Sequence, residues 1–154
     1  MRRVISLLAG ATLGLALLTG LPTAAQAQPV AGPSAPSGFT AQGDGYFYAW
    51  DAIDGADNPT TANCRWFNSD DNWENNCGNF RNRASSVKNN SANGNYANLY
   101  YHQWYGGAYA CIAPGDYWND LRVRYFSWGP ADGKGKATNN EIAGFKWTSR
   151  QCGT

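Results

Sequence analysis

From residue 45 onward the chain consists of short aromatic or apolar segments, each ended within a few residues by Gly, Asn or Asp. Apolar Leu121, Val123 and Tyr125 alternate with arginines, which is the period of two of a half-buried strand. No long stretch has a helical period, and the many Asn and Gly residues favour turns over helices. The sequence therefore predicts an all-β domain. The expected strands are 45–50, 63–68, 84–88, 98–105, 108–113, 121–125 and 142–148.

Four cysteines lie among these segments, at Cys64, Cys77, Cys111 and Cys152. An even number of cysteines in an exported chain indicates disulfides. A zinc site would need three or four Cys or His ligands at close spacing. The sequence has no CxxC pair, and His102 is its single histidine. Three pairings are possible. We favour Cys64–Cys77 and Cys111–Cys152, because each bridge then closes a loop within one half of the domain.

The N-terminus has the three parts of a secretory signal peptide. Arg2 and Arg3 precede an uncharged stretch over 4–21, and the small-x-small sequence at 25–27 follows it. The stretch is near the minimum of about 18 residues for a membrane anchor. However, it contains glycines, and no basic stop-transfer signal follows it. We predict that 1–27 is a cleaved signal peptide, that 28–44 is a flexible segment rich in Pro, Ala, Gly and Ser, and that 45–154 is a single β domain of a secreted protein.

The charge balance excludes two classes of partner. Arg2 and Arg3 leave with the signal peptide, so that ten of the twelve basic residues remain against eleven acidic ones. A near-neutral chain has no electrostatic attraction to nucleic acid or to an anionic membrane. We expect a monomer that binds neither of them.

Three stretches resemble a family of secreted bacterial peptidase inhibitors typified by a small metalloproteinase inhibitor. They are NRASSVKN at 82–89, LYYHQWYGG at 99–107 followed by CIAPGD at 111–116, and NEIAGFKW at 140–147. That family has a Greek-key sandwich like the βγ-crystallins. The resemblance covers about 63–148 and implies a small βγ-crystallin-like sandwich, here stabilised by two disulfides.

A βγ-crystallin repeat begins with an aromatic residue, four residues, a second aromatic, one residue and a glycine. Tyr100, Tyr105 and Gly107 have this spacing. The aromatic rings pack a folded hairpin, and the glycine takes a conformation that a Cβ would hinder. A later serine caps the hairpin by hydrogen bonding. Ser85 and Ser86 match this serine element for the first repeat.

The sequence departs from the repeat pattern in both halves. The first repeat offers Trp66 or Phe67 as its opening aromatic, but has Asn-Trp-Glu at 72–74 where a glycine is expected. The second repeat has Ala143 and Gly144 in place of the serine pair.

In calcium-binding members of the crystallin family, loop oxygens hold the ion, including that of the Ser or Thr. Asn82 and Ser85 could supply part of one calcium site, whereas Asn139, Asn140 and Ala143 would make a poor second one. No other cofactor is expected.

The residues with catalytic chemistry are too few for an enzyme. A Ser-His-Asp triad would have to use His102, which lies among aromatic residues of an expected strand and fits a packed or surface role better. Paired cysteines leave no thiol nucleophile, and a glycosidase needs two placed carboxylates. GxSxG, HExxH and P-loop patterns are absent. We therefore expect a non-enzymatic protein.

The resemblance implies a secreted inhibitor of peptidases, in particular metalloendopeptidases, that binds its target tightly through a rigid loop. Rigidity lowers the ordering cost of binding. Thermolysin-like enzymes favour a bulky aliphatic residue after the cleaved bond, which makes Cys111–Ile112 a candidate reactive bond. Both residues also fit a buried strand.

The alternative is a module that binds cell-wall glycan, another carbohydrate or a cell surface. Exposed Trp and Tyr rings stack on sugars, and Asn and Asp bond their hydroxyl groups. The candidate tryptophans are Trp73, Trp104, Trp118 and Trp128.

Overall fold

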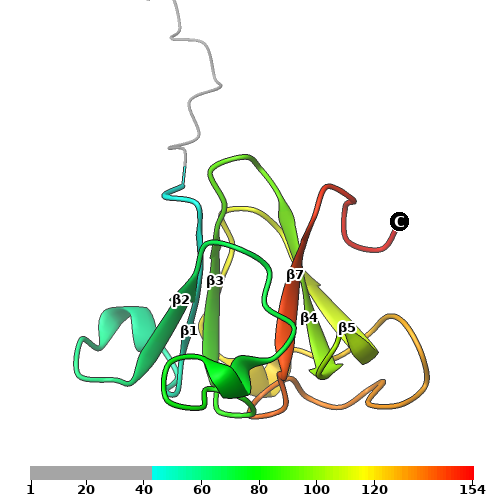
Figure 1. The fold of residues 1–154 in the computed structure, drawn as a ribbon, viewed down its shortest axis with the longest axis horizontal. Helices are drawn as coiled ribbons and strands as arrows, with labels where there is room; N and C mark the ends of the chain where they lie inside the picture. Colours follow the sequence, from blue (N-terminus) through cyan, green and yellow to red (C-terminus); the bar gives the residue numbers. More distant parts are fainter. Residues whose placement is uncertain (1–42) are drawn as a thin grey trace, which may run out of the picture. The chain divides into compact units, whose positions relative to one another are not determined.

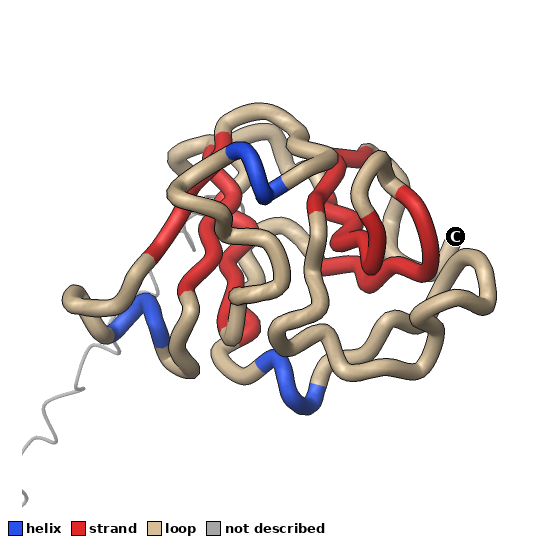
Figure 2. Tube along the Cα trace, turned by 60° about the horizontal axis from the view of Figure 1, so that its bottom comes forward, coloured by secondary structure: helices blue, strands red, loops and turns tan. Residues whose placement is uncertain are grey.

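Strands account for most of the regular structure in this computed structural model, which describes residues 43–154. The predicted signal peptide and nearly all of the predicted 28–44 segment lie outside the described residues. The strands are β1 (Tyr46–Trp50), β2 (Asn63–Trp66), β3 (Ser86–Asn90), β4 (Tyr96–His102), β5 (Gly106–Ile112), β6 (Tyr117–Trp118) and β7 (Gly144–Thr148). Three single-turn 3₁₀ helices lie in the connections (Figure 2): η1 (Gly55–Asp57), η2 (Trp73–Asn75) and η3 (Leu121–Val123). None of the helices in this part of the chain has the length and apolar character to cross a membrane.

The strands form two antiparallel sheets (Figure 1). One sheet, called sheet A, has the order β2-β1-β3-β6, and the other, sheet B, has the order β5-β4-β7. In both sheets the third long strand returns to lie beside the first one, which is a Greek-key arrangement. The predicted all-β Greek-key sandwich is therefore confirmed.

The two sheets are built from two equivalent repeats that exchange a short segment. β1, β2 and β3 of the first repeat correspond to β4, β5 and β7 of the second one. The short segment after each hairpin crosses to the other sheet: Trp118 pairs with Val87 of β3, and Asp70 bridges to Phe145 of β7. Each repeat thus completes the sheet of the other, so that neither sheet is complete without both halves of the chain.

The equivalence extends to individual hydrogen bonds. Asn82 N–H donates to the Ile142 carbonyl and Asn140 N–H donates to the Ala84 carbonyl, both at 2.9 Å. Asn82 and Asn140 also share a left-handed backbone, with φ of 55° and 56°. The residues before η2 and η3 cap these helices in the same way, because the Asn72 and Asp120 side chains each accept from the backbone N–H two residues later.

Aromatic side chains fill the space between the sheets. Phe47 of β1 stacks on Phe145 of β7 with ring centroids 4.5 Å apart, and Trp66 of β2 stacks on Trp73 at 4.4 Å. Burying one large apolar side chain contributes roughly 1.5–3 kcal/mol. The aromatic residues of alternate strand positions therefore supply the contact that holds sheet A to sheet B.

The prediction of a strand over 121–125 is wrong. Residues Leu121–Val123 form η3, because the Asp120 side chain accepts from Arg122 N–H and caps a helical turn. Leu121 is buried, while Val123 and Tyr125 are exposed. The alternation of apolar residues and arginines therefore does not mark one buried face.

Both predicted disulfides are confirmed. Cys64 is bonded to Cys77 and Cys111 to Cys152, which leaves no free cysteine. The first bridge closes a sequence separation of 13 residues and the second one of 41. Loops of this size contribute about 3–4 kcal/mol by restricting the unfolded chain. Disulfides persist in oxidising compartments, which fits a protein that works outside the cytoplasm.

Candidate functional site

The β4–β5 hairpin brings the three predicted repeat residues together. The Tyr100 and Tyr105 rings lie 5.3 Å apart, and Gly107 has a φ of +71°. A Cβ at Gly107 would lie 3.0 Å from His102 Cδ2 and 3.2 Å from the Asp132 carbonyl oxygen. Position 107 therefore combines a left-handed backbone with a crowded site, both of which favour glycine.

Ser86 stabilises the connection between β1 and β2 of the first repeat through two hydrogen bonds. Its hydroxyl donates to the Ala52 carbonyl at 2.8 Å and accepts from Gly55 N–H at 3.1 Å. The hairpin that it caps is β1–β2, so the first repeat opens in β1. The expectation that Trp66 or Phe67 opens this repeat is wrong, because Trp66 lies in β2, the second strand.

Gly144 occupies the place of Ser86 in the second repeat. Gly144 pairs with Tyr100 in the β4–β7 register, as Ser86 pairs with Trp50 in the β1–β3 register. A Cβ at Gly144 would lie only 2.7 Å from the Asp70 carbonyl oxygen. The segment that crosses over from the first repeat therefore fills the space that a capping serine would need.

The residues considered for calcium lie in the two symmetric loops. Ser85 Oγ is 3.4 Å from Asn140 Oδ1, so the amide that meets this serine comes from the other repeat. Within residues 43–154, no group of three or more His, Cys, Asp and Glu side chains is placed to hold a metal ion. Calcium prefers six to eight oxygen ligands. Calcium binding through Asn82 and Ser85 remains a prediction.

The candidate reactive bond lies inside a sheet. Cys111 and Ile112 belong to β5, pair with Asn98 and Ala97 of β4, and are 6% and 0% exposed. A peptidase would have to unfold this strand to bind the bond. The burial therefore argues against Cys111–Ile112 as a reactive site, and supports the alternative that both residues are core.

The four candidate tryptophans have different environments. Trp73 is fully buried in the core, so it is wrong as a ligand-stacking residue. Trp118 and Trp128 are half-buried, the first beneath the Arg124 guanidinium and the second stacked on Tyr109. Trp104 is 70% exposed. Trp104 is thus the candidate that a protein partner could reach most fully.

Trp104 lies at the turn between β4 and β5, in the segment 103–105 that we call the hairpin tip. Trp104 and Tyr105 have φ values of 61° and 57°, both in the left-handed region. This region costs a residue with a Cβ about 1–2 kcal/mol, and bulky side chains are rare there. A strained backbone of this kind persists only where its surroundings hold it.

Hydrogen bonds hold the hairpin tip to residues 71–74, in the segment of the first repeat that crosses to sheet B. Trp104 N–H donates to the Asp71 carbonyl at 2.9 Å. The Gln103 side-chain amide donates to Asn72 Oδ1 at 2.7 Å and to Glu74 Oε2 at 2.8 Å. The tip is therefore a fixed projection whose indole faces solvent.

The Tyr105 side chain forms the base of the tip. Its ring packs against Tyr100, and the Lys146 ammonium lies 5.3 Å from its centroid. Burial raises the pKa of Tyr105, and the nearby charges of Asp71 and Asp70 raise it further. The phenol therefore stays neutral under ordinary conditions and acts as a packing group.

A second surface lies on the outer face of sheet B. Tyr100 and Tyr109 are directly opposite in the β4–β5 register, and Trp128 bridges to Tyr109 at the edge of β5. The ring centroids are 5.6 Å apart for Tyr100 and Tyr109 and 6.2 Å for Tyr109 and Trp128, the latter pair stacked. We call these three rings the aromatic strip.

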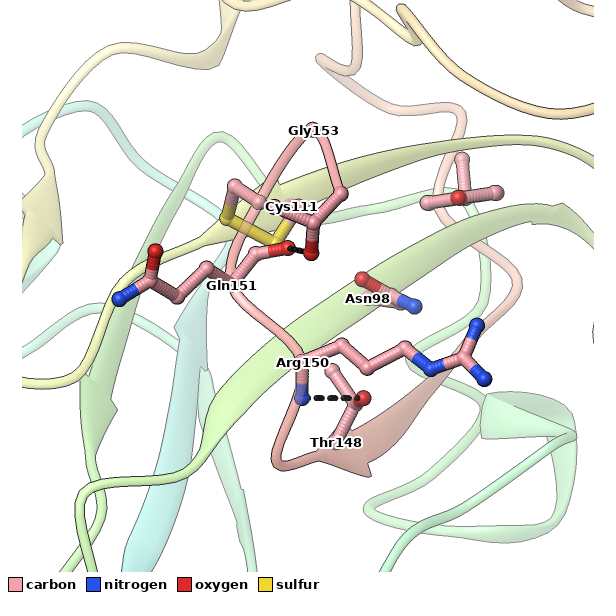
Figure 3. A pocket seen from close by; sticks show the side chains of 9 residues that line it. Asn98, Cys111, Thr148, Arg150, Gln151 and Gly153 are labelled. Atoms are coloured by element: carbon pink, nitrogen blue, oxygen red, sulfur yellow. Dashed lines mark hydrogen bonds between the residues drawn. A yellow bond between two sulfur atoms is a disulfide. The ribbon is translucent and has the colours of Figure 1, made fainter.

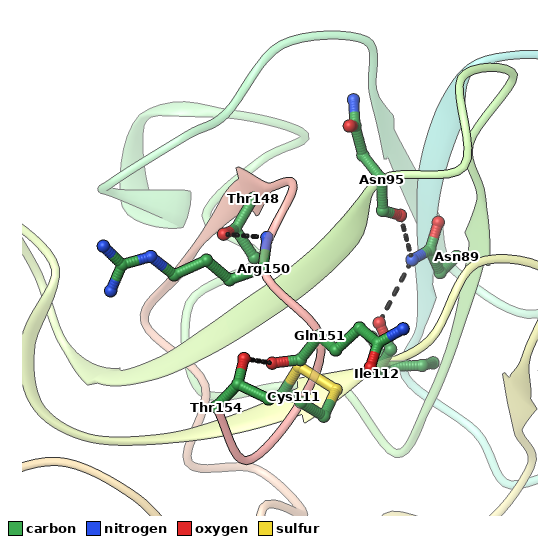
Figure 4. The surroundings of a disulfide bond; sticks show 9 residues. Asn89, Asn95, Cys111, Ile112, Thr148, Arg150, Gln151 and Thr154 are labelled. Atoms are coloured by element: carbon green, nitrogen blue, oxygen red, sulfur yellow. Dashed lines mark hydrogen bonds between the residues drawn. A yellow bond between two sulfur atoms is a disulfide. The ribbon is translucent and has the colours of Figure 1, made fainter.

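A polar pocket of about 110 Å³ adjoins the strip (Figure 3). Tyr109 belongs to both the strip and the pocket. The Cys111–Cys152 disulfide ties the segment after β7 to β5 and so forms one wall (Figure 4). The polar side chains that line the pocket are Asn98, Thr148, Arg150, Gln151 and Thr154.

The segment that walls this pocket has its own hydrogen bonds. Arg150 N–H donates to Thr148 Oγ1 at 3.1 Å, and Thr154 Oγ1 donates to the Gln151 carbonyl at 2.9 Å (Figure 4). Behind β5, buried Asn89 donates to the Ile112 carbonyl at 3.2 Å and to the Asn95 carbonyl at 2.9 Å. The pocket therefore has a fixed β5 wall and a disulfide-anchored outer wall.

His102, the single histidine, lies on the surface at the end of β4. Its Nε2 is 2.6 Å from a carboxylate oxygen of Asp132 in the loop before β7. Both side chains are largely exposed. The pair links the hairpin to that loop and fits the surface role expected for this histidine.

Fold and surfaces together define an all-β, disulfide-bonded domain of two Greek-key repeats. No family model matches the sequence, and no curated protein gives a significant match. The comparisons thus add no support for the inhibitor family, and that resemblance stays one of sequence motifs.

Two solved structures are similar to the chain, each at 14% identity. One comes from work on the evolution of the eye lens βγ-crystallin domain fold. It matches 70% of this chain and 88% of its own, with a TM-score of 0.49. The other is a βγ-crystallin from an archaeon, which matches 67% and 96% with a TM-score of 0.46.

Proposed function

We propose that the protein is a secreted, non-catalytic inhibitor of an extracellular peptidase, and that the hairpin tip contacts the enzyme. The exposed Trp104, fixed on a left-handed turn, is the observation that carries this proposal. Tryptophan is strongly enriched among the residues that dominate protein–protein binding energy. The sequence resemblance supplies the class of target, a peptidase and in particular a metalloendopeptidase.

The order of the tip favours tight binding. A loop that is already fixed before association loses little conformational entropy on binding. Here the backbone N–H of Trp104 and the side chain of Gln103 are both bonded to the segment 71–74 of the other repeat. The backbone that carries the indole is thus already fixed before binding and adds no further ordering cost.

The backbone of the tip also sets the mode of inhibition. Peptidases bind the chain that they cleave in an extended conformation, in which φ is negative. Trp104 and Tyr105 have positive φ values. The tip therefore acts as an aromatic plug that enters an apolar subsite, and the peptide bonds of 103–105 stay uncut.

Inhibition titrations test the proposal. The secreted protein would be titrated against a thermolysin-like metallopeptidase and a panel of serine and cysteine peptidases, with an inhibition constant measured for each. We expect inhibition of a metallopeptidase at micromolar concentration or below. Trp104→Asn should raise the inhibition constant about 30-fold, because loss of a central aromatic contact costs about 2 kcal/mol or more.

Tyr125→Ala is the matched control, because Tyr125 is another exposed aromatic residue and lies outside the tip. It should change the inhibition constant less than about threefold. Mass spectrometry of the inhibited mixture should find the chain intact between 103 and 105. The absence of inhibition across the whole panel, or equal inhibition by wild type and Trp104→Asn, would refute the proposal.

A further inference from the structure

The aromatic strip lies on the face of sheet B that points away from the core. The side chains of β4 that point to the core are Ala97 and Leu99, which are fully buried. Tyr100 lies on the opposite face, and Tyr109 lies across from it. Both rings are half-buried, as is Trp128. The three rings therefore form a row on the solvent side of the sheet, and the Tyr105 ring packs against Tyr100 at one end of this row.

The spacing within this row fits one kind of ligand. Adjacent strands are about 4.8 Å apart, and the observed centroid distances of 5.6 Å and 6.2 Å follow from that spacing. A pyranose ring has a flat face of C–H groups and a length close to these distances. The centroid spacing therefore matches the spacing of successive sugars in one chain, whereas a compact ligand would contact a single ring.

The adjoining pocket supplies the polar contacts that a sugar needs. Asn98 is two residues from Tyr100 on the same face of β4, about 7 Å away along the strand. Amides and hydroxyl groups from Asn98, Thr148 and Gln151 line the pocket. Its 110 Å³ is smaller than the roughly 300–1,000 Å³ of pockets that enclose a whole ligand. The pocket fits one substituent of a longer chain that lies along the strip.

The charges beside the strip favour a negative substituent. Arg150 lines the pocket, and Lys146 pairs with Asn98 in the neighbouring strand. The side chains of the strip and of the pocket include no Asp or Glu. A guanidinium group binds a carboxylate through two parallel hydrogen bonds.

We infer that the outer face of sheet B binds a polysaccharide that carries carboxylate groups, with its sugar rings on Tyr100, Tyr109 and Trp128 and a carboxylate at Arg150. This site shares no residue with the hairpin tip, although Tyr105 of the tip packs against Tyr100, and Trp104 itself lies outside the site.

Calorimetric titration with oligogalacturonate tests the site, with a neutral cello-oligosaccharide of equal length and polyglutamate as comparison ligands. We expect oligogalacturonate to bind, the neutral chain to bind about tenfold more weakly, and polyglutamate not to bind. Tyr109→Ala and Trp128→Ala should each weaken oligogalacturonate binding about tenfold or more. Arg150→Gln should remove the difference between the acidic and the neutral chain.

Tyr48→Ala is the matched control, because Tyr48 is a half-buried ring on β1 of sheet A that stacks on Trp50. It should leave binding unchanged, and thermal melts should show that each variant is folded. Trp104→Asn should also bind sugar normally, so this site can fail or succeed independently of peptidase inhibition. Failure of oligogalacturonate to bind, equal binding of polyglutamate, or equal losses in Tyr48→Ala and Tyr109→Ala would each overturn the inference.

Discussion

Trp104 and Asp54 occupy equivalent places in the two repeats. Each donates its backbone N–H to a carbonyl of the opposite repeat at 2.9 Å, Asp54 to Asn119 and Trp104 to Asp71. Each has a left-handed φ, 52° for Asp54 and 61° for Trp104. Asp and Asn tolerate this conformation, whereas tryptophan does so at a cost. Asp54 therefore suits the left-handed backbone of the first repeat, whereas Trp104 is strained at the equivalent position of the second repeat.

Trp104→Asn should therefore stabilise the protein while it weakens inhibition. Relief of the left-handed strain is expected to raise the free energy of unfolding by about 1 kcal/mol and the melting temperature by a few degrees. Thermal melts followed by near-ultraviolet circular dichroism would measure this. Phe67→Asn, at an exposed aromatic residue of the first repeat, is the control and should give no such gain. A lower melting temperature for Trp104→Asn would show that the indole is needed for folding.

Ser86→Ala should destabilise the first repeat. The buried Ser86 hydroxyl bonds both the Ala52 carbonyl and Gly55 N–H, and its removal leaves the buried Gly55 N–H and the partly buried Ala52 carbonyl without this partner. The expected loss is about 1–3 kcal/mol in the free energy of unfolding. Urea titration would measure it. Ser127→Ala is the control, because the exposed Ser127 hydroxyl makes one local bond to Tyr125, and it should change stability by less than about 0.5 kcal/mol.

Gly144→Ser, which copies the serine of the first repeat, should destabilise the second repeat. Its Cβ would lie 2.7 Å from the Asp70 carbonyl oxygen, which the backbone bridge between Asp70 and Phe145 of β7 holds in place. Overpacking at a rigid contact costs typically about 1–3 kcal/mol. Gly94→Ser is the comparison, because Gly94 has a φ of +70° and no atom within 4 Å of an added Cβ, so its loss measures left-handed strain without crowding. Gly144 has no left-handed φ, so a Gly144→Ser variant as stable as wild type in urea titrations would contradict crowding at position 144.

The strand positions were predictable because aromatic and apolar residues at every second place face the core. Phe47 and Ala49 of β1, for example, are fully buried, and the flanking tyrosines are not. The segment 121–125 has the same alternation. It fails because Asp120 caps a helical turn locally, and this hydrogen bond outweighs a pattern of only three apolar residues.

Neither the strand that opens the first repeat nor the set of residues that meet at each site could be predicted from the sequence. Ser86 meets Gly55 across 31 residues, so the spacing of the motif does not reveal the hairpin that the serine caps. In the same way, Gln103 reaches Glu74 across 29 residues. The exchange of short segments between repeats brings these pairs together. Trp104 and Trp73 look alike in sequence, and only this exchange makes one exposed and the other buried.

The Cys111–Cys152 disulfide should be needed for the pocket more than for the fold. Replacement of both cysteines by serine frees the segment after β7 but leaves β4, β5 and β7 paired. We expect a loss of about 2–5 kcal/mol in stability and loss of the preference for acidic sugars. Sugar titration and urea titration would measure the two effects. The matched variant lacks the Cys64–Cys77 disulfide. Its stability should fall by a similar amount, but it should still bind sugar. Loss of sugar binding in both variants would contradict the assignment of the pocket.

Asp44 should make stability fall in acid. Partial loss of hydration acts to raise the pKa of the exposed Asp44, but hydrogen bonds from the Tyr48 hydroxyl and from Tyr46 N–H outweigh it and hold this pKa below its ordinary value of 3.8. A carboxyl group with a lowered pKa in the folded state stabilises the fold when it is ionised. The contribution is therefore present above the unfolded pKa, near 3.8, and is lost as the pH falls through the lower folded pKa.

Asp44→Asn tests this contribution. Wild type should be more stable than the variant at pH 6, and the difference should shrink below about pH 4, where the wild-type carboxyl becomes protonated in the unfolded chain first. Urea titrations from pH 6 to pH 2.5 would measure the difference. Asp57→Asn is the control, because Asp57 is an exposed carboxylate in η1. A stability difference between wild type and Asp44→Asn that is constant over the whole range would show that the carboxylate charge has no role, and that the Tyr48 hydroxyl bonds an amide equally well.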